Sequence, residues 1–173
     1  MDTLLVGSEV PRVDGLAKVT GKAVYGDDII MNNMLYGVCR YVDIPAGRID
    51  ALDLSEAEKV PGVVRIATWN DIPGQRKLGA IVPDHPPIID KEIAYRGDVV
   101  AVVAAETYEA ACITVDKIKI TYNPWEPITS PEEAMKPGAR LIHSELDSNI
   151  INRHHTAKGD IDAGFAASSH IFE

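Results

Sequence analysis

The clearest pattern of hydrophobic and polar positions lies between residues 99 and 122. Residues 99–105 (VVAVVAA) form a continuous apolar run that is short enough for a strand buried on both faces. Thr107 is suited to cap a helix, and apolar residues follow it at helical spacing, at Tyr108, Ala111, Cys112 and Val115. Residues 117–122 (KIKITY) then alternate strictly, which places Ile118, Ile120 and Tyr122 on the inner face. The pattern predicts a strand, a helix and a second strand in succession.

The first ninety residues carry weaker patterns. Three segments rich in β-branched or aromatic residues predict strands: 17–25 (AKVTGKAVY), 35–42 (LYGVCRYV) and 63–69 (VVRIATW). Ser55 and Glu58 have the spacing of a capping box, which predicts a short helix that ends at Pro61-Gly62. Residues 70–90 are rich in proline and lack periodicity, so they predict a long surface loop and a candidate docking surface.

Beyond residue 122 the sequence alternates between extended and short helical signals. Pro124, Pro127 and Pro131 predict an extended connector. A small helix is expected where Ser130 provides an N-cap, Pro131 the first helical position and Glu133 the third. Residues 143–160 are expected to be a linker, and Ile161 and Phe165 to begin another element. The last residues alternate like an unpaired strand, which we interpret as a sign that the natural protein continues past Glu173.

Composition and charge exclude several classes of protein. Apolar residues make up 46% of the 173 residues and charged residues 25%, as is typical of a folded globular chain. The net charge of −9, with no basic run, argues against a nucleic-acid binder or an anionic-membrane binder. No apolar stretch approaches the roughly 20 residues needed to span a bilayer, and Met1-Asp2 lacks the basic flank of a signal peptide. Cys39 and Cys112 lie in apolar segments, which favours reduced thiols in a cytoplasmic protein.

Two short motifs resemble cofactor sites but fail on spacing. The segment 15–22 resembles a phosphate-binding loop, but five residues separate Gly15 from Gly21 and Ala23 follows Lys22, so a strand edge or a turn is favoured. The tripeptide 134–136 (Ala-Met-Lys) resembles the segment that presents a biotinylated lysine. That lysine needs the tip of a hairpin, whereas the capping signals place Lys136 on the last turn of a helix.

The histidines and acids likewise form no recognisable active site. His154 and His155 are neighbours in the expected linker, with no carboxylate or cysteine at ligand spacing, so a solvated pair is favoured. Asp84 and His85 are a conceivable acid–base pair, but sequence neighbours rarely orient each other and Pro86-Pro87 makes the segment stiff. We therefore predict no catalytic, cofactor-binding or metal-binding residue in this chain.

An ordered series of short motifs nevertheless resembles one protein family. It comprises 12–15 (RVDG), 18–25 (KVTGKAVY) with Asp28, 60–64 (VPGVV), 70–73 (NDIP), Tyr95 and Gly97, 99–107 (VVAVVAAET), 109–111 (EAA), 118–122 (IKITY) and 158–165 (KGDIDAGF). In this order they resemble the start of the molybdenum-binding subunit of the xanthine dehydrogenase/aldehyde oxidase family. Two stretches depart from the pattern: 43–47 (DIPAG), where the family usually has Pro-His-Ala, and 97–99 (GDV), where relatives commonly have Gly-Gln-Pro.

The resemblance implies an α+β fold of the α/β hammerhead type, with a mixed sheet and a few short helices. It implies an N-terminal arm at 1–14, the hammerhead domain at 15–137, and at 138–173 a linker and the start of a molybdopterin-binding domain. Family members hydroxylate purines, aldehydes or N-heterocycles with oxygen from water. They use molybdopterin with molybdenum, iron–sulfur clusters and FAD, and their pterin-binding stretch and base glutamate lie further along than residue 173.

Two hypotheses follow. In the first, the chain is the scaffolding and docking fragment of such a cytoplasmic hydroxylase, inactive by itself. Its partners are then the remaining molybdopterin-binding domains and the iron–sulfur and FAD domains or subunits, with no nucleic acid and no membrane. In the second, the chain is a complete, non-enzymatic binding or adaptor module.

Overall fold

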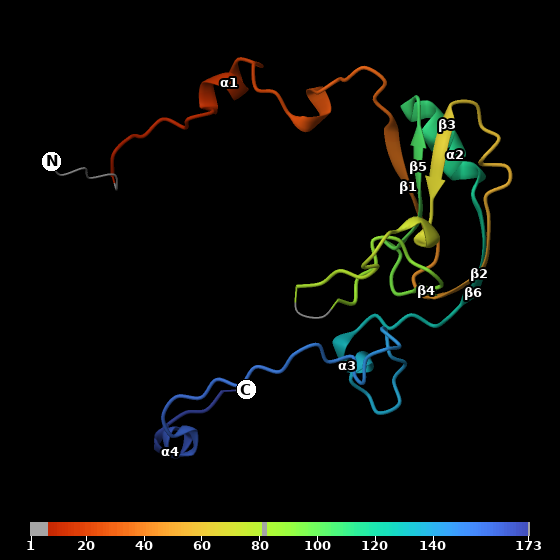
Figure 1. Cartoon of the computed structure of the whole chain (residues 1–173). Helices are drawn as coiled ribbons and strands as arrows, with labels where there is room; N and C mark the ends of the chain where they lie inside the picture. The colour runs from red at the N-terminus through yellow and green to blue at the C-terminus, as the bar shows by residue number, and fades with distance from the viewer. Residues whose placement is uncertain (1–6, 81–82, 173) are drawn as a thin grey trace.

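The computed structural model describes residues 7–80 and 83–172. Its folded body consists of two three-stranded antiparallel sheets and one helix, and chain segments extend from the body at both ends (Figure 1). The α+β class and the few short helices expected from the sequence are confirmed. The first six residues of the expected N-terminal arm, and Glu173, lie outside the described residues.

The first sheet has the order β1-β5-β3, formed by Tyr36–Tyr41, Val99–Ala105 and Val63–Ala67. The central strand β5 contributes Ala101, Val103 and Ala105 to one hydrophobic cluster and Val100 to another. Alternate residues of a strand face opposite sides, so β5 is buried on both faces, as its apolar run predicted. The strands expected at 35–42 and 63–69 are confirmed, and the second ends at Ala67, before the 3₁₀ turn η2 (Trp69–Asp71).

Helix α2 (Tyr108–Lys117) covers one face of this sheet, against β1 and β5 (Figure 1). The side chain of Thr107 accepts a hydrogen bond from the Ala110 N–H at 3.1 Å, which confirms the expected cap. The expected apolar face was partly wrong, because Tyr108 is exposed while Thr114 is fully buried. Thr114 tolerates burial because its hydroxyl donates to the Ala110 carbonyl at 2.7 Å. The buried residues of the helix are all small: Ala110, Ala111 and Thr114.

The second sheet has the order β4-β2-β6, formed by Glu92–Ile93, Gly47–Asp53 and Lys119–Pro124. Strand β6 confirms the alternating pattern, because Ile120 and Tyr122 pack against the core. Strand β2 was not predicted. A Cβ on its first residue, Gly47, would lie 2.6 Å from the Asn123 carbonyl oxygen, so this close approach to β6 requires glycine.

Two predicted elements before β3 are absent. Residues 15–19 form the short helix α1 (Gly15–Val19), and Asp14, just before it, pairs with Lys18 at 2.6 Å. The chain then turns at Gly21, which has a φ of 69°, and continues to the 3₁₀ turn η1 (Gly26–Asp28). The strand expected at 17–25 was wrong because these residues pair with no described strand, so their β-branched side chains have no sheet to join. The capping-box helix after Ser55 was also wrong, since residues 55–60 form successive turns that end at Gly62.

The C-terminal segments follow the expected order. Helix α3 (Pro131–Ala134) begins at Ser130, whose side chain accepts from the Glu133 N–H at 3.1 Å. Residues 143–160 contain no helix or strand, and helix α4 (Ile161–Ala167) is the element expected around Phe165. Residues 168–172 form no strand. In the part of the chain that the structure describes, no helix is long and apolar enough to cross a membrane.

A polar joint connects the two sheets. Arg40 of β1 donates to both carboxylate oxygens of Asp43, at 3.1 and 2.7 Å, and Tyr122 of β6 donates to Asp43 Oδ2 at 3.0 Å. The Arg40 side chain retains 20% of its exposure, and its Nε is buried without a hydrogen-bond partner among the described residues. Its guanidinium holds the pKa of Asp43 below the usual value, whereas burial raises the pKa of Tyr122.

Candidate functional site

One candidate site is a cavity of about 580 Å³ between the long loop and the segment after α3. Its lining comes from three parts of the chain: residues 69–91 of the loop region, residues 92–98 around the turn before β5, and residues 142–145. Each lining segment lacks a long helix or strand, so turn geometry and side-chain contacts hold the cavity together. A cavity of this size is within the range of small-molecule sites.

The turn at 94–98 forms one wall and is held by a buried carboxylate. Asp98 accepts hydrogen bonds from the N–H groups of Ala94 at 2.7 Å and Tyr95 at 3.2 Å. A Cβ at Gly97 would lie 2.1 Å from the Tyr95 ring, so glycine allows the ring to fold back over the turn. The Asp98 carboxylate therefore has a structural use, because it satisfies two backbone donors.

The loop forms a second wall. Leu78 and His85 exchange two backbone hydrogen bonds, at 2.8 and 3.0 Å, which pairs the two sides of the loop. The His85 ring lies 6.4 Å from the Tyr95 ring, and the Arg76 guanidinium lies 5.2 Å from the centre of the Trp69 ring. The segment predicted to be a featureless surface loop is therefore folded back on itself at residues 78 and 85.

Residues 143–145 form the third wall through polar contacts. His143 Nε2 lies 3.6 Å from Asp84 Oδ2, and the Ser144 hydroxyl donates to Glu92 at 2.8 Å. Glu145 pairs with Lys77, which lowers the pKa of the glutamate. None of these three contacts is indicated by the sequence, because the partners are far apart in the chain and no local pattern signals them.

Ser144 and His143 are neighbours in the chain but do not pair with each other as a nucleophile and a base. A serine nucleophile needs its hydroxyl directed at a histidine that an acid orients. Here the Ser144 hydroxyl donates to Glu92, while His143 faces Asp84. No three His, Cys, Asp or Glu residues come together as a metal site anywhere in residues 7–80 or 83–172. The printed contacts of residues 143–145 join chain segments that are distant in the sequence.

Of the other residues considered from the sequence, Asp84 and His85 line the cavity, whereas His154, His155, Lys136 and the motif around Gly15 do not. Asp84 and His85 take different partners, His143 and Tyr95, so they do not orient each other. His154 and His155 are exposed, and Lys136 is exposed just after α3. The motif around Gly15 is the helix α1 and a turn, rather than a strand edge.

Comparison with known proteins identifies the fold. Residues 20–126 match the model of the aldehyde oxidase and xanthine dehydrogenase a/b hammerhead domain. The chain belongs to this family. The matched residues include both sheets, α2 and all the loop residues that line the cavity. They do not include the wall formed by residues 143–145, which lies after the matched range.

Several relatives extend the likeness over nearly the whole chain. The hammerhead chain is 38% identical over 162 residues to a probable xanthine dehydrogenase component of Bacillus subtilis, covering 94% of this chain and 22% of the relative. It is 34% identical over 172 residues to the nicotinate dehydrogenase large molybdopterin subunit of Eubacterium barkeri, covering 99% and 40%. The aldehyde oxidoreductase of Desulfovibrio desulfuricans superposes with a TM-score of 0.73 at 32% identity, covering 79% and 16%. The chain thus spans between 16% and 40% of the length of these relatives.

Proposed function

We propose that this hammerhead chain is a scaffolding and docking part of a molybdenum-dependent hydroxylase similar to xanthine dehydrogenase. The parent enzyme hydroxylates a purine, an aldehyde or an N-heterocycle with oxygen from water. Family membership over residues 20–126 supports the parent activity. The observation that carries the docking role is the exposure of apolar side chains on the segments that extend from the body.

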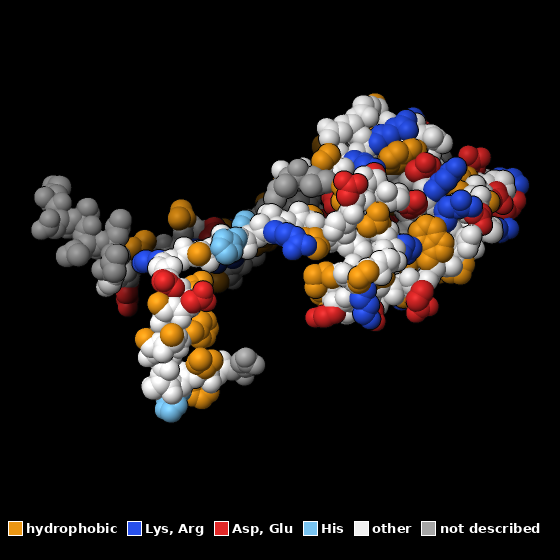
Figure 2. All heavy atoms as spheres, turned by 90° about the horizontal axis from the view of Figure 1, so that it is seen from below, with side chains coloured by type: hydrophobic (Ala, Val, Ile, Leu, Met, Phe, Trp, Pro, Cys, Tyr) orange, Lys and Arg blue, Asp and Glu red, His pale blue; other side chains and the backbone are white. Residues whose placement is uncertain are grey.

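The extending segments carry hydrophobic side chains that the described residues leave uncovered (Figure 2). Val13 of the N-terminal segment is fully exposed, Ile30 is 83% exposed, and Phe172 near the other end is 92% exposed. Each such side chain contributes roughly 1.5–3 kcal/mol when it is fully buried. Several of them along two extended segments give a strong driving force to pack against other domains.

Among the described residues, no three His, Cys, Asp or Glu side chains group as potential ligands of a metal ion. Four of the carboxylates that line the candidate cavity have partners: Glu145 pairs with Lys77, Glu92 accepts from Ser144, Asp84 lies near His143, and Asp98 accepts from backbone donors. The proposal therefore assigns molybdopterin to the remaining domains of the same subunit, and the iron–sulfur clusters and FAD to partner domains or subunits. It makes residues 15–137 the hammerhead unit, with 1–14 as an arm and 138–173 as the passage to a molybdopterin-binding domain, in a cytoplasmic enzyme.

The test compares the purified chain with its parent assembly. Residues 1–173 are expected to hold no stoichiometric molybdenum by elemental analysis and to hydroxylate neither hypoxanthine nor nicotinate with a dye as electron acceptor. The gene that encodes the chain is expected to continue into a glycine-rich pterin-binding stretch. A stop codon after Glu173 with no such stretch beyond it contradicts the parent activity, and stoichiometric molybdenum in the isolated chain contradicts the scaffold role.

A second experiment addresses docking. In the assembled parent subunit, Val13→Asp is expected to weaken packing and to lower the melting temperature, because it puts a charge into an apolar contact. The matched control Glu9→Asp alters an exposed acid of the same segment without adding a charge. Equal melting temperatures for the two variants contradict the proposed packing of this segment.

A further inference from the structure

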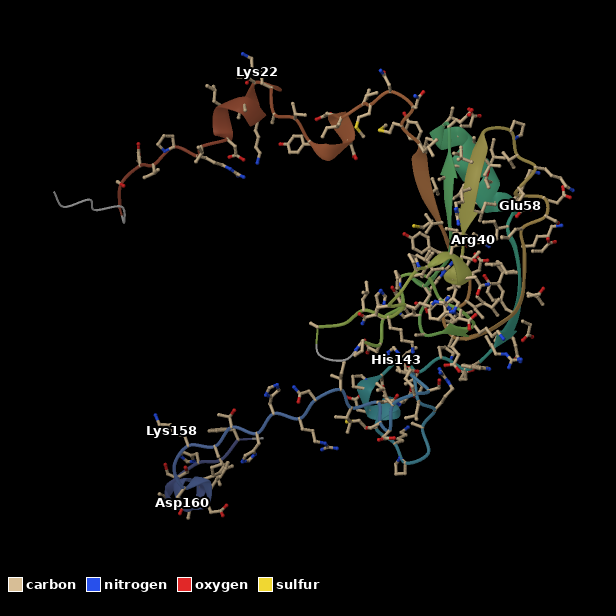
Figure 3. All side chains as sticks on the ribbon, in the orientation of Figure 1. Lys22, Arg40, Glu58, His143, Lys158 and Asp160 are labelled. Atoms are coloured by element: carbon tan, nitrogen blue, oxygen red, sulfur yellow. The ribbon has the colours of Figure 1, made fainter. Side chains whose placement is uncertain are left out.

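Three consecutive residues after α3 contact two points of the long loop and the first residue of β4, which follows it. His143 lies against Asp84, Ser144 donates to Glu92 at 2.8 Å, and Glu145 pairs with Lys77. Figure 3 shows His143 on the segment that runs beside the folded body. We call residues 141–149 the strap, and residues 77–80 with 83–92 the loop base. The strap therefore crosses the loop base at three points instead of touching it at one.

The strap is organised by its own hydrogen bonds. The Asn149 side chain accepts from the Ile142 N–H at 2.9 Å and donates to the carbonyls of Arg140 at 2.9 Å and Ala134 at 3.0 Å. The Leu146 N–H donates to the His143 carbonyl at 3.0 Å, which closes a turn within the strap. One amide side chain thus ties both ends of the strap to the end of α3, and the strap presents its contacts from a fixed position.

The loop base is anchored in the core at one end only. Ile88 and Ile89 are buried, whereas Leu78 is exposed and its pairing with His85 is confined to a single two-bond bridge. Segments with few buried apolar contacts and exposed hydrogen bonds open at low free energy. The part of the loop base around the Leu78–His85 bridge therefore depends on contacts from outside the loop.

We propose that the strap is a latch that fixes the conformation of the loop base, so that the two segments open and close as one unit. The chain beyond residue 149 leads directly into the exposed C-terminal segment. A displacement of that segment is therefore transmitted to the loop base through the strap. This coupling is a property of residues 1–173 and does not rest on the parent reaction.

A charge exchange between the latch partners tests this proposal by hydrogen–deuterium exchange of the full 173-residue chain. Lys77→Glu and Glu145→Lys each replace an attraction by a repulsion, and each is expected to speed exchange about tenfold in the part of the loop base around the Leu78–His85 bridge, residues 77–80 and 83–85. The double variant restores opposite charges and is expected to return to within about twofold of the original rate. Asn149→Ala is expected to speed exchange in the strap and the loop base together.

Matched controls make the same charge changes elsewhere. Lys22→Glu and Glu58→Lys alter exposed residues that lie away from the strap, and neither is expected to change exchange in the loop base (Figure 3). Unchanged protection of β5 verifies that each variant is folded. Two results overturn the proposal: a loop base that is indifferent to Asn149→Ala while the strap loosens, and a double variant that exchanges as fast as the singles.

Discussion

Replacing Asp43 by alanine removes the centre of the joint between the two sheets. The variant deletes both carboxylate acceptors of the Arg40 guanidinium and the acceptor of the Tyr122 hydroxyl. Arg40 then keeps its 2.7 Å hydrogen bond to the Tyr41 carbonyl, but its side chain is only 20% exposed and loses the carboxylate with which it forms an ion pair. The loss of Asp43 is therefore expected to weaken the contact between β1 and β6.

The magnitude follows from the exposure of the partners. Hydrogen bonds to charged groups contribute about 1.5–3 kcal/mol when they are buried. The Asp43 side chain is 57% exposed, so solvent screens much of its interaction. We expect Asp43→Ala to lower the free energy of unfolding by about 2 kcal/mol, and Tyr122→Phe by about 1 kcal/mol.

The assay is urea unfolding of the full chain, with Asp50→Ala as the matched control. Asp50 also pairs with an arginine, Arg48, but both side chains are well exposed, at 40% and 53%, and both lie on β2. A surface pair of this kind contributes about 0.5 kcal/mol. With a slope of about 2 kcal/mol per molar urea, Asp43→Ala is expected to lower the midpoint by about 1 M.

The dependence on pH gives an independent check with a fixed sign. The folded pKa of Asp43 is lowered, first by its bond to Arg40, so its contribution is fully present above the ordinary aspartate pKa of about 3.9. It is lost as the pH falls through the folded value. The difference between the original chain and Asp43→Ala is thus expected to be constant from pH 7 to 5 and to shrink below about pH 4. Equal losses for Asp43→Ala and Asp50→Ala, or a difference that grows in acid, refute the reasoning.

Three further predictions concern the folded body, and urea unfolding tests each. Gly47→Ala is expected to lower the free energy of unfolding by about 2–3 kcal/mol because its Cβ meets a backbone oxygen. Gly37→Ala is expected to be tolerated, since the nearest atom to its Cβ lies at 4.0 Å, and equal losses of stability in the two variants contradict the close approach. Thr107→Ala removes the α2 cap and is expected to lower the free energy of unfolding by about 1 kcal/mol. A loss no larger than that of Ser130→Ala, which removes the cap of the peripheral helix α3, argues against this contribution. Val103→Ala, in the fully buried centre of β5, is expected to lower the free energy of unfolding by about 2 kcal/mol. An equal loss of stability for Val64→Ala, at an exposed position, contradicts the place of Val103 in the core.

The sequence predicted those elements whose signal is local. The apolar run of β5, the Thr107 cap and the alternation of β6 each specify their own conformation, and the structure has all three. Strand β2 has no clear signal in the sequence, because charged residues interrupt it and only Gly47 and Ile49 are buried. The strand expected at 17–25 failed for the opposite reason, since β-branched residues form a strand only where a partner is available.

The candidate site could not be predicted in the same way. Its contacts join residues 68 positions apart, as in Lys77 and Glu145, or 52 apart, as in Glu92 and Ser144. Each of these residues is an ordinary surface residue in its local sequence, without a motif around it. Their meeting depends on where the turn at 94–98 and the Asn149 hydrogen bonds place the backbone, which is a tertiary property.

The strand order has a consequence for a chain that is cut. Sheet β1-β5-β3 takes β1 and β3 from before the long loop and β5 from after it, whereas sheet β4-β2-β6 takes only β2 from before it. Cleavage within residues 70–90 therefore separates two pieces, neither of which contains a complete sheet. The central strand of each sheet comes from the opposite piece to its neighbours, so the halves are interlocked. A nicked molecule is expected to migrate as one particle until it is denatured, and the two pieces made separately are expected to fold only when they are mixed.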